Sequence, residues 1–302
     1  MTGNSGDGRS GGGQGTVPPA PLTAFWPIEQ RAPCVISSPH SGRYYPPDLM
    51  EETCLDEDTL RLSEDFRVDA LCAAAPQIGL PLIAATYARA YVDCNRDAWE
   101  LDPDMFSDSL PSYVNRCSPG VLTGFGTIPR QVTPTDAIYA GRLRFEDARR
   151  RIETVHLPYH QALDHALERT RRRFGCAFLI DMHSMPSLPP TGDQRPAAFV
   201  LGDRHGEAAP ADFVDEVEMF LADLGFTVAR NAPYAGGFIT QHYGQKNHGV
   251  YSLQVEIDRA LYMHQKRFQA NDGFDATRQV ITSLMENIAA WTTSYAHRRA
   301  AE

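Results

Sequence analysis

The chain has 302 residues, of which 42% are hydrophobic and 22% are charged, a composition typical of a soluble globular protein. No apolar run approaches the roughly 18 residues that a transmembrane helix requires, so the sequence predicts no membrane span. The formal net charge of −10 argues against a nucleic-acid or acidic-membrane partner, because either would require a basic surface.

The first 22 residues are rich in glycine, serine and proline, and we expect a disordered tail because residues 1–22 have almost nothing to bury. They lack the basic-then-apolar order of a signal peptide. The six cysteines include no CxxC pair, which favours reduced thiols in a cytoplasmic protein over disulfides or a cysteine zinc site. Residues 23–302 show no internal boundary and are predicted to form one domain, as a monomer or a small homo-oligomer.

Short runs rich in β-branched residues alternate with longer helical patterns along the rest of the chain. The short runs predict strands over 33–38, 81–87, 90–93, 176–182, 197–201, 226–230 and 250–257. The helical patterns cover 58–75, 136–173, 211–224 and 273–294. Apolar strands that alternate with helices are typical of an α/β sheet covered on both faces. The segment 97–134 has no clear period, and such a long irregular stretch is more often a functional loop than a linker.

Two histidines follow predicted strands in the same way. His40 comes after the strand 33–38 in the stretch SPHSG, and His183 comes after the strand 176–182 in the stretch DMHS. A lone histidine in such a turn usually satisfies a backbone group, which is the structural alternative for His40. Because ligands gather outside the carboxyl ends of strands in an open α/β sheet, the two histidines could instead share a zinc ion.

A catalytic zinc normally takes three protein ligands and leaves one position for water, so a carboxylate should complete the set. The predicted helix 58–75 offers the neighbouring carboxylates Glu64 and Asp65. A solvated helix face is the alternative for this pair, and the pattern alone leaves open which of the two would be the ligand.

The stretch YVDCNRD supplies a candidate binding group. Asn95 and Arg96 follow the predicted strand 90–93, and an arginine there could bind a carboxylate through two parallel hydrogen bonds. Pairing of Arg96 with Asp93 or Asp97, which would only hold the loop, is an equally good interpretation of the spacing.

Glu256 lies in the predicted strand 250–257, whose other residues are nearly all apolar. A buried, unpaired carboxylate is costly, and such a residue usually has a partner or a function. A glutamate that faces solvent from the strand is the alternative, which the apolar surroundings disfavour.

Several short stretches occur in one order between residues 33 and 264, and together they resemble the N-formylglutamate amidohydrolase (N-formylglutamate deformylase) family. They are SPHSGRYYP, EDFRVDAL, YVDCNRD, PYHQAL, DMHSMPS, LGDRHG, YAGGFITQHYG and LQVEIDRALYM. The resemblance implies a three-layer α/β sandwich around a mixed central sheet, as in the zinc carboxypeptidases and aspartoacylase. It also implies zinc-dependent hydrolysis of a small N-acyl amino acid, typically N-formyl-L-glutamate to formate and L-glutamate in histidine breakdown.

Carried over by position, the resemblance implies that His40, His183 and Asp65 hold zinc or another divalent metal, with Glu64 as the rival of Asp65. The chain departs from many relatives at Phe66-Arg67, where they have an aromatic-His pair. It also has Cys94 where a larger apolar residue is common. These departures bear on the substrate more than on the metal site.

The resemblance further implies that Arg96, supported by Asn95, binds the α-carboxylate of the substrate and that Glu256 is the general base. Arg89 or Arg96 could also stabilise the developing oxyanion. A carboxypeptidase-like or other N-acyl-amino-acid hydrolase is the main alternative, and the loop 97–134 would then set the size of the substrate. A non-catalytic member that only binds a ligand or a metal is the non-enzyme alternative.

Overall fold

The computed structural model describes residues 17–190 and 195–301. Most of the expected N-terminal tail, residues 1–16, lies outside the described residues, and the first strand begins at Leu22. No helix in the described part of the chain combines the length and the apolar composition needed to cross a membrane.

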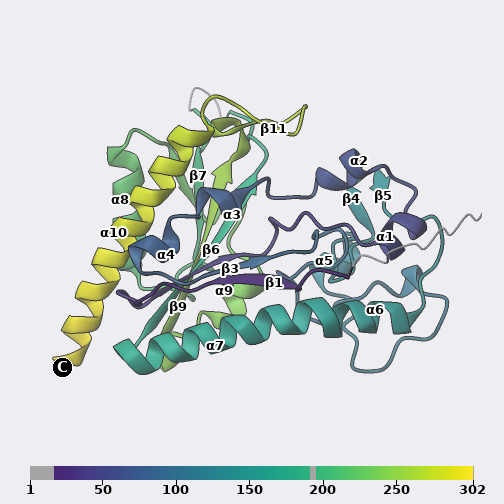
Figure 1. Cartoon of the computed structure of the whole chain (residues 1–302), viewed down its shortest axis with the longest axis horizontal. Helices are drawn as coiled ribbons and strands as arrows, with labels where there is room; N and C mark the ends of the chain where they lie inside the picture. Colours follow the sequence, from purple (N-terminus) through teal and green to yellow (C-terminus); the bar gives the residue numbers. More distant parts are fainter. Residues whose placement is uncertain (1–16, 191–194, 302) are drawn as a thin grey trace, which may run out of the picture.

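A mixed seven-stranded sheet forms the centre of the part that the structure describes (Figure 1). Its strands in spatial order are β1 (Leu22–Phe25), β3 (Leu82–Ala85), β2 (Cys34–Ser38), β6 (Ala177–Met185), β9 (Val250–Asp258), β7 (Phe199–Gly202) and β8 (Val228–Arg230). The pairs β1–β3 and β7–β9 are antiparallel, and the other neighbours are parallel. The prediction of an α/β fold with a mixed central sheet is confirmed.

Helices cover both faces of this sheet, which gives three layers (Figure 1). One face carries α3 (Val68–Leu71), α4 (Ala75–Ile78), α8 (Ala211–Asp223) and α10 (Phe274–Ala300). The other carries α7 (Leu157–Phe174) and α9 (Phe238–Tyr243). Side chains alternate between the faces along each strand. In β2, accordingly, Val35 packs on the α7 side and Ile36 on the α10 side, and both are buried.

The remaining elements are short, and several gather beyond one end of the sheet, around the N-terminus of α7 (Figure 1). These are α1 (Pro47–Glu52), α2 (Glu57–Arg61), α5 (Pro119–Leu122), α6 (Phe145–Arg151) and the hairpin of β4 (Gln131–Thr133) with β5 (Asp136–Ala137). A π-helical turn, Ile152–His156, joins α6 to α7. Single 3₁₀ turns occur at Pro103–Met105, Lys246–His248 and Arg259–Leu261, and β10 (Met263–His264) pairs with β11 (Gln269–Ala270).

The prediction of one helix over 58–75 is wrong. The chain leaves the helix after Arg61 and re-enters it only at Val68, so Glu64 and Asp65 lie in the turn between α2 and α3. Arg67 has a φ of 51°, in the left-handed region, which a continuous right-handed helix cannot contain. The turn places the acidic pair beside the end of β2, where the Asp65 N–H donates to the His40 carbonyl at 3.0 Å.

Two further predictions of secondary structure are wrong. Residues 90–93 form a turn and irregular backbone rather than a strand. The N–H groups of Tyr91 and Val92 donate to the Ala88 carbonyl, and that of Asp93 donates to the Thr127 carbonyl at 2.8 Å. The helix predicted from residue 136 begins at Phe145, because 136–137 pair with β4. The strand β1 was not predicted.

Candidate active site

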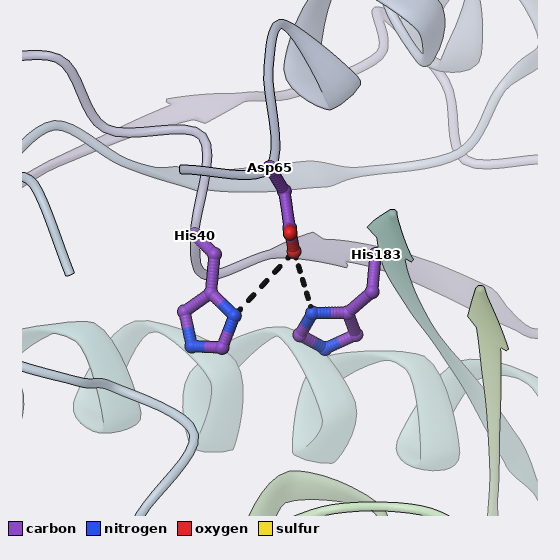
Figure 2. Close-up of side chains that lie close together, drawn as sticks. All are labelled: His40, Asp65 and His183. Carbon is purple, nitrogen blue, oxygen red and sulfur yellow. Dashed lines mark hydrogen bonds and ion pairs between the residues drawn. The ribbon is translucent and has the colours of Figure 1, made fainter. Parts of the chain in front are cut away.

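Three buried side chains from separate elements converge at one edge of the sheet (Figure 2). His40 follows β2, His183 lies near the end of the adjacent strand β6, and Asp65 reaches them from the turn between α2 and α3. The Asp65 Oδ2 atom lies 2.9 Å from His183 Nδ1 and 3.4 Å from His40 Nδ1. One nitrogen or oxygen atom from each residue lies within 4.8 Å of the others, so that one metal ion could bind all three.

The opposite nitrogen of each histidine faces a second buried carboxylate. His40 Nε2 donates to Asp93 Oδ1 at 2.7 Å, and His183 Nε2 donates to Asp181 Oδ2 at 2.8 Å. A carboxylate on the outer nitrogen fixes the tautomer of a metal-binding histidine and raises its basicity. Both Nδ1 atoms are thereby directed toward Asp65.

The donor set fits a divalent metal. The Nδ1 atom of His40 is buried, and among the described residues it has no hydrogen-bond partner. Burial disfavours the charged imidazole of His183, yet Asp181 and Asp65 raise its pKa well above the ordinary value. Because a carboxylate faces each ring nitrogen of His183, a positive charge between these groups is favourable, and a proton or a metal ion can supply it. Two imidazole nitrogens and one carboxylate form a ligand set that catalytic zinc uses.

Of the two neighbouring acidic residues, only Asp65 faces the histidines. The side chain of Glu64 instead accepts hydrogen bonds from Tyr45 Oη at 2.6 Å and from Arg61 Nε at 3.4 Å. Burial raises the pKa of the Glu64 carboxyl. The geometry therefore favours Asp65 over Glu64 as the acidic ligand.

Except for Glu64, the residues singled out from the sequence as site residues line one cavity of about 420 Å³. They are His40, Asp65, Arg89, Asn95, Arg96, His183 and Glu256. This volume is within the usual range for small-molecule sites. The irregular segment 97–134 contributes Phe125, Pro129, Gln131 and Val132 to the wall, a position from which a loop can limit the size of a ligand.

Glu256 points into this cavity from β9. It is paired in register with His183 on the parallel neighbour β6, so the two side chains lie on the same face of the sheet. Burial raises the pKa of Glu256 to about 7, and the Gln254 amide donates to its Oε1 at 2.9 Å. Arg259, the nearest cation in the sequence, pairs instead with Asp65 Oδ1 at 3.3 Å. Glu256 is therefore a buried carboxyl group whose pKa lies near neutral pH.

Three arginines line the cavity, and they differ in whether their N–H groups already bond other protein groups. Arg89 donates to Asp93 Oδ2 at 2.6 Å, and Arg259 donates to the Glu64 carbonyl and to Ser184 Oγ. The Arg96 guanidinium makes no hydrogen bond to any described residue, and its buried Nε lies 3.9 Å from Asp93 Oδ2. Arg96 therefore has donors to offer a ligand.

Asn95 lines the same cavity, but part of its side chain is already engaged. Its Oδ1 accepts the Ile239 N–H at 2.8 Å, and its own N–H donates to Asp93 Oδ1 at 2.8 Å. Asn95 can thus support the loop that carries Arg96, and its side-chain NH₂ group lies 3.2 Å from His183 Nε2.

The sequence model of the family described as N-formylglutamate amidohydrolase matches residues 32–263, a span that includes every residue of this cavity. The chain belongs to the N-formylglutamate amidohydrolase family. It is 30% identical over 274 residues to N-formylglutamate deformylase of Pseudomonas aeruginosa, covering 86% of this chain and 94% of that protein. It is 28% identical over 267 residues to N-formylglutamate deformylase of Pseudomonas putida, with the same coverage.

A solved member of the N-formylglutamate amidohydrolase family, from Ralstonia eutropha, is similar in fold. Its TM-score with this chain is 0.85 at 36% sequence identity, covering 90% of this chain and 98% of the other. The match covers most of both chains, so the family resemblance extends to the architecture.

In this member of the N-formylglutamate amidohydrolase family, sequence reasoning gave Asp181 and Gln254 no role and suggested Asp93 only as a partner of Arg96. Asp93 and Asp181 bond the outer nitrogens of the two histidines, and Gln254 bonds Glu256. Asp181 and Gln254 had a weak signal, because each lies two positions from a candidate residue on the same strand and therefore on the same face of the sheet. The contact of Arg259 with Asp65 left no signal in the sequence, because 194 positions separate the two residues.

Proposed function

We propose that this protein is a metal-dependent hydrolase that cleaves the amide bond of N-formyl-L-glutamate to give formate and L-glutamate. The observation that carries the proposal is the convergence of His40, Asp65 and His183 in one cavity with Glu256 and an arginine that has free donors. Membership of the N-formylglutamate amidohydrolase family and the names of the relatives support this choice of substrate.

His40 Nδ1, His183 Nδ1 and a carboxylate oxygen of Asp65 would hold the metal, for which zinc is the first candidate. When bound, zinc would lower the pKa of a coordinated water to about 7 and polarise the acyl oxygen. Asp93 and Asp181 would keep each imidazole in the tautomer that leaves Nδ1 free. Arg259 would restrain the other oxygen of Asp65, toward which it already donates.

Glu256 would act as the general base. Its carboxylate would take a proton from the attacking water and deliver it to the leaving nitrogen, for which a pKa near the working pH is favourable. Arg89 lines the same cavity and would favour negative charge that develops on the acyl oxygen.

Arg96 would bind the α-carboxylate of the substrate. Replacing it with lysine keeps the charge but loses the planar pair of donors, so KM for N-formyl-L-glutamate should rise about tenfold with a smaller change in kcat. Arg130→Lys is the matched control, because Arg130 lies in the adjacent loop 97–134, pairs with Asp102 and does not line the cavity. Steady-state kinetics on both variants make the comparison. Equal KM values of wild-type enzyme for N-formyl-L-glutamate and its α-amide would contradict this role.

The experiment that tests the substrate is a panel of N-formyl and N-acetyl amino acids, together with short peptides, assayed on purified protein. We expect the highest kcat/KM for N-formyl-L-glutamate. Preferential release of a C-terminal amino acid from the peptides would favour a carboxypeptidase-like activity, and hydrolysis of no compound would favour a non-catalytic binding role.

The scattered cysteines support a cytoplasmic location. The proposed substrate would assign the reaction to histidine breakdown.

A further inference from the structure

A pair of stacked histidines lies under the loop that carries Arg96. His156 ends the π-helical turn before α7, and His160 follows one turn later in the stretch PYHQAL. The two rings have centroids 4.4 Å apart and an interplanar angle of 31°, and both side chains are buried. Neither belongs to the cluster that would hold the metal. Single π-helical turns often occur at functional sites.

Each ring donates to a different backbone carbonyl of the same short segment. His156 Nε2 donates to the Arg96 carbonyl at 2.8 Å, and His160 Nε2 donates to the Cys94 carbonyl at 2.9 Å. A carbonyl can only accept, so both hydrogen bonds fix the tautomer with the proton on Nε2. The Tyr243 hydroxyl, 2.9 Å away, then donates to His160 Nδ1. Burial lowers the pKa of both histidines, that of His160 to about 3, which keeps the stacked rings neutral.

The segment 93–97 needs these donors because it is not part of the sheet. Its buried carbonyls have no strand partner, and a buried carbonyl without a hydrogen bond is costly. The loop 97–134 also bonds this segment: the Thr127 carbonyl accepts from the Asp93 N–H, and the Thr127 hydroxyl donates to the Asp97 carbonyl. Three of the segment's side chains line the cavity, namely Asp93, Asn95 and Arg96. The two histidines therefore bond the backbone of the segment whose side chains line the cavity.

We propose that His156 and His160 are positioning residues with divided tasks. His156 bonds the Arg96 carbonyl and so positions the Arg96 side chain, which would bind the substrate. His160 bonds the carbonyl of Cys94, between Asp93 and Asn95, and so positions the Asp93 carboxylate that orients His40. This inference rests on the proposed function for the roles of Arg96 and His40. It extends that function to two residues that touch neither the substrate nor the metal.

For His156, the test is a pair of polar substitutions that differ in reach. His156→Gln can still place an N–H near the Arg96 carbonyl, whereas the shorter His156→Asn cannot. We expect the asparagine variant to raise KM for N-formyl-L-glutamate about tenfold with kcat changed by less than about threefold, because a displaced clamp weakens binding before chemistry. The glutamine variant should stay within about threefold of wild type in both constants.

For His160, the same pair of substitutions is read out by metal affinity. His160→Asn should weaken zinc binding about 10- to 100-fold, the usual effect of disturbing the outer partner of a ligating histidine. Zinc competition against a chromophoric chelator measures this without turnover. His160→Gln should restore most of the affinity, and His156→Asn should leave zinc affinity within about threefold of wild type.

Hydrogen exchange separates positioning from general destabilisation. In both asparagine variants, peptides that cover residues 89–99 should exchange faster, whereas peptides from β6 and β9 should not. Leu167→Ala is the control, because Leu167 is buried on α7 about two turns beyond His160 and contributes to the same apolar layer. It should lower the melting temperature and leave KM and zinc affinity unchanged.

The proposal is overturned if His156→Asn and His160→Asn lower the melting temperature like Leu167→Ala with wild-type KM, zinc affinity and exchange of residues 89–99. Identical phenotypes at the two positions would also overturn the division of tasks. A wild-type protein that does not hydrolyse N-formyl-L-glutamate would contradict the proposed function instead. The exchange and zinc measurements would then still decide whether the histidines position the segment.

Discussion

Glu256→Gln is expected to reduce turnover of N-formyl-L-glutamate about 10²- to 10⁴-fold, the usual contribution of a positioned general base. The amide has nearly the same shape as the carboxylate, so metal content and melting temperature should stay close to those of the wild type. Glutamine cannot take a proton from water, and turnover should therefore fall through kcat rather than KM. Zinc content, melting temperature and steady-state kinetics on this one variant provide the measurement.

Glu100→Gln is the matched control for this substitution. Burial raises the pKa of the Glu100 carboxyl as well, but this residue bonds Ser118 and does not line the cavity. Its replacement should leave kcat within about threefold of wild type.

Reduced zinc content in Glu256→Gln would make Glu256 a metal ligand rather than the general base. A lower melting temperature with an unchanged rate would make it structural, and a zinc-loaded variant with full activity would end its assignment as the base.

Asp65→Asn should reduce zinc affinity by at least about 100-fold and bring activity near background. Losing even an outer partner of a ligand costs 10- to 100-fold, and here the ligand itself loses its charge. The amide would also face His183 Nδ1 and the Arg259 guanidinium without the negative charge that both now contact. Zinc competition and kinetics at saturating zinc measure the two effects.

The adjacent Glu64 offers an unusually close control. Glu64→Gln changes a neighbouring buried carboxyl in the same way, but its side chain faces Tyr45 and Arg61 rather than the histidines. We expect it to alter stability while zinc affinity stays within about threefold of wild type. A loss of zinc in Glu64→Gln with retention in Asp65→Asn would reverse the assignment of the acidic ligand.

The central sheet could be predicted because its strands are apolar on both faces and bounded by polar residues. The runs around Val35, Leu179 and Leu253 are the clearest examples, and all three side chains are buried. The edge strand β1 was not predicted, because only alternate residues of Leu22–Phe25 are partly buried and the strand is only four residues long. Burial on both faces leaves a strong signal in the sequence, whereas an edge position leaves a weak one.

The candidate site could be predicted in its residues but not in its local structure. His40 and His183 were recognisable because each histidine ends an apolar run. The helix predicted around Asp65 failed because the left-handed conformation of Arg67 and the hydrogen bond to the His40 carbonyl depend on tertiary contacts. The strand predicted over 90–93 failed for a related reason, since distant side chains rather than a neighbouring strand satisfy the backbone that follows it.

The most direct test of the account is the rate of N-formyl-L-glutamate hydrolysis measured during a zinc titration of chelator-treated protein. We expect negligible activity after chelation and a linear recovery that reaches a plateau at one zinc ion per chain. Asp65→Asn should show no recovery at the same zinc concentrations, and Glu64→Gln should recover like the wild type. Full activity in protein shown by elemental analysis to contain no metal would contradict the central claim.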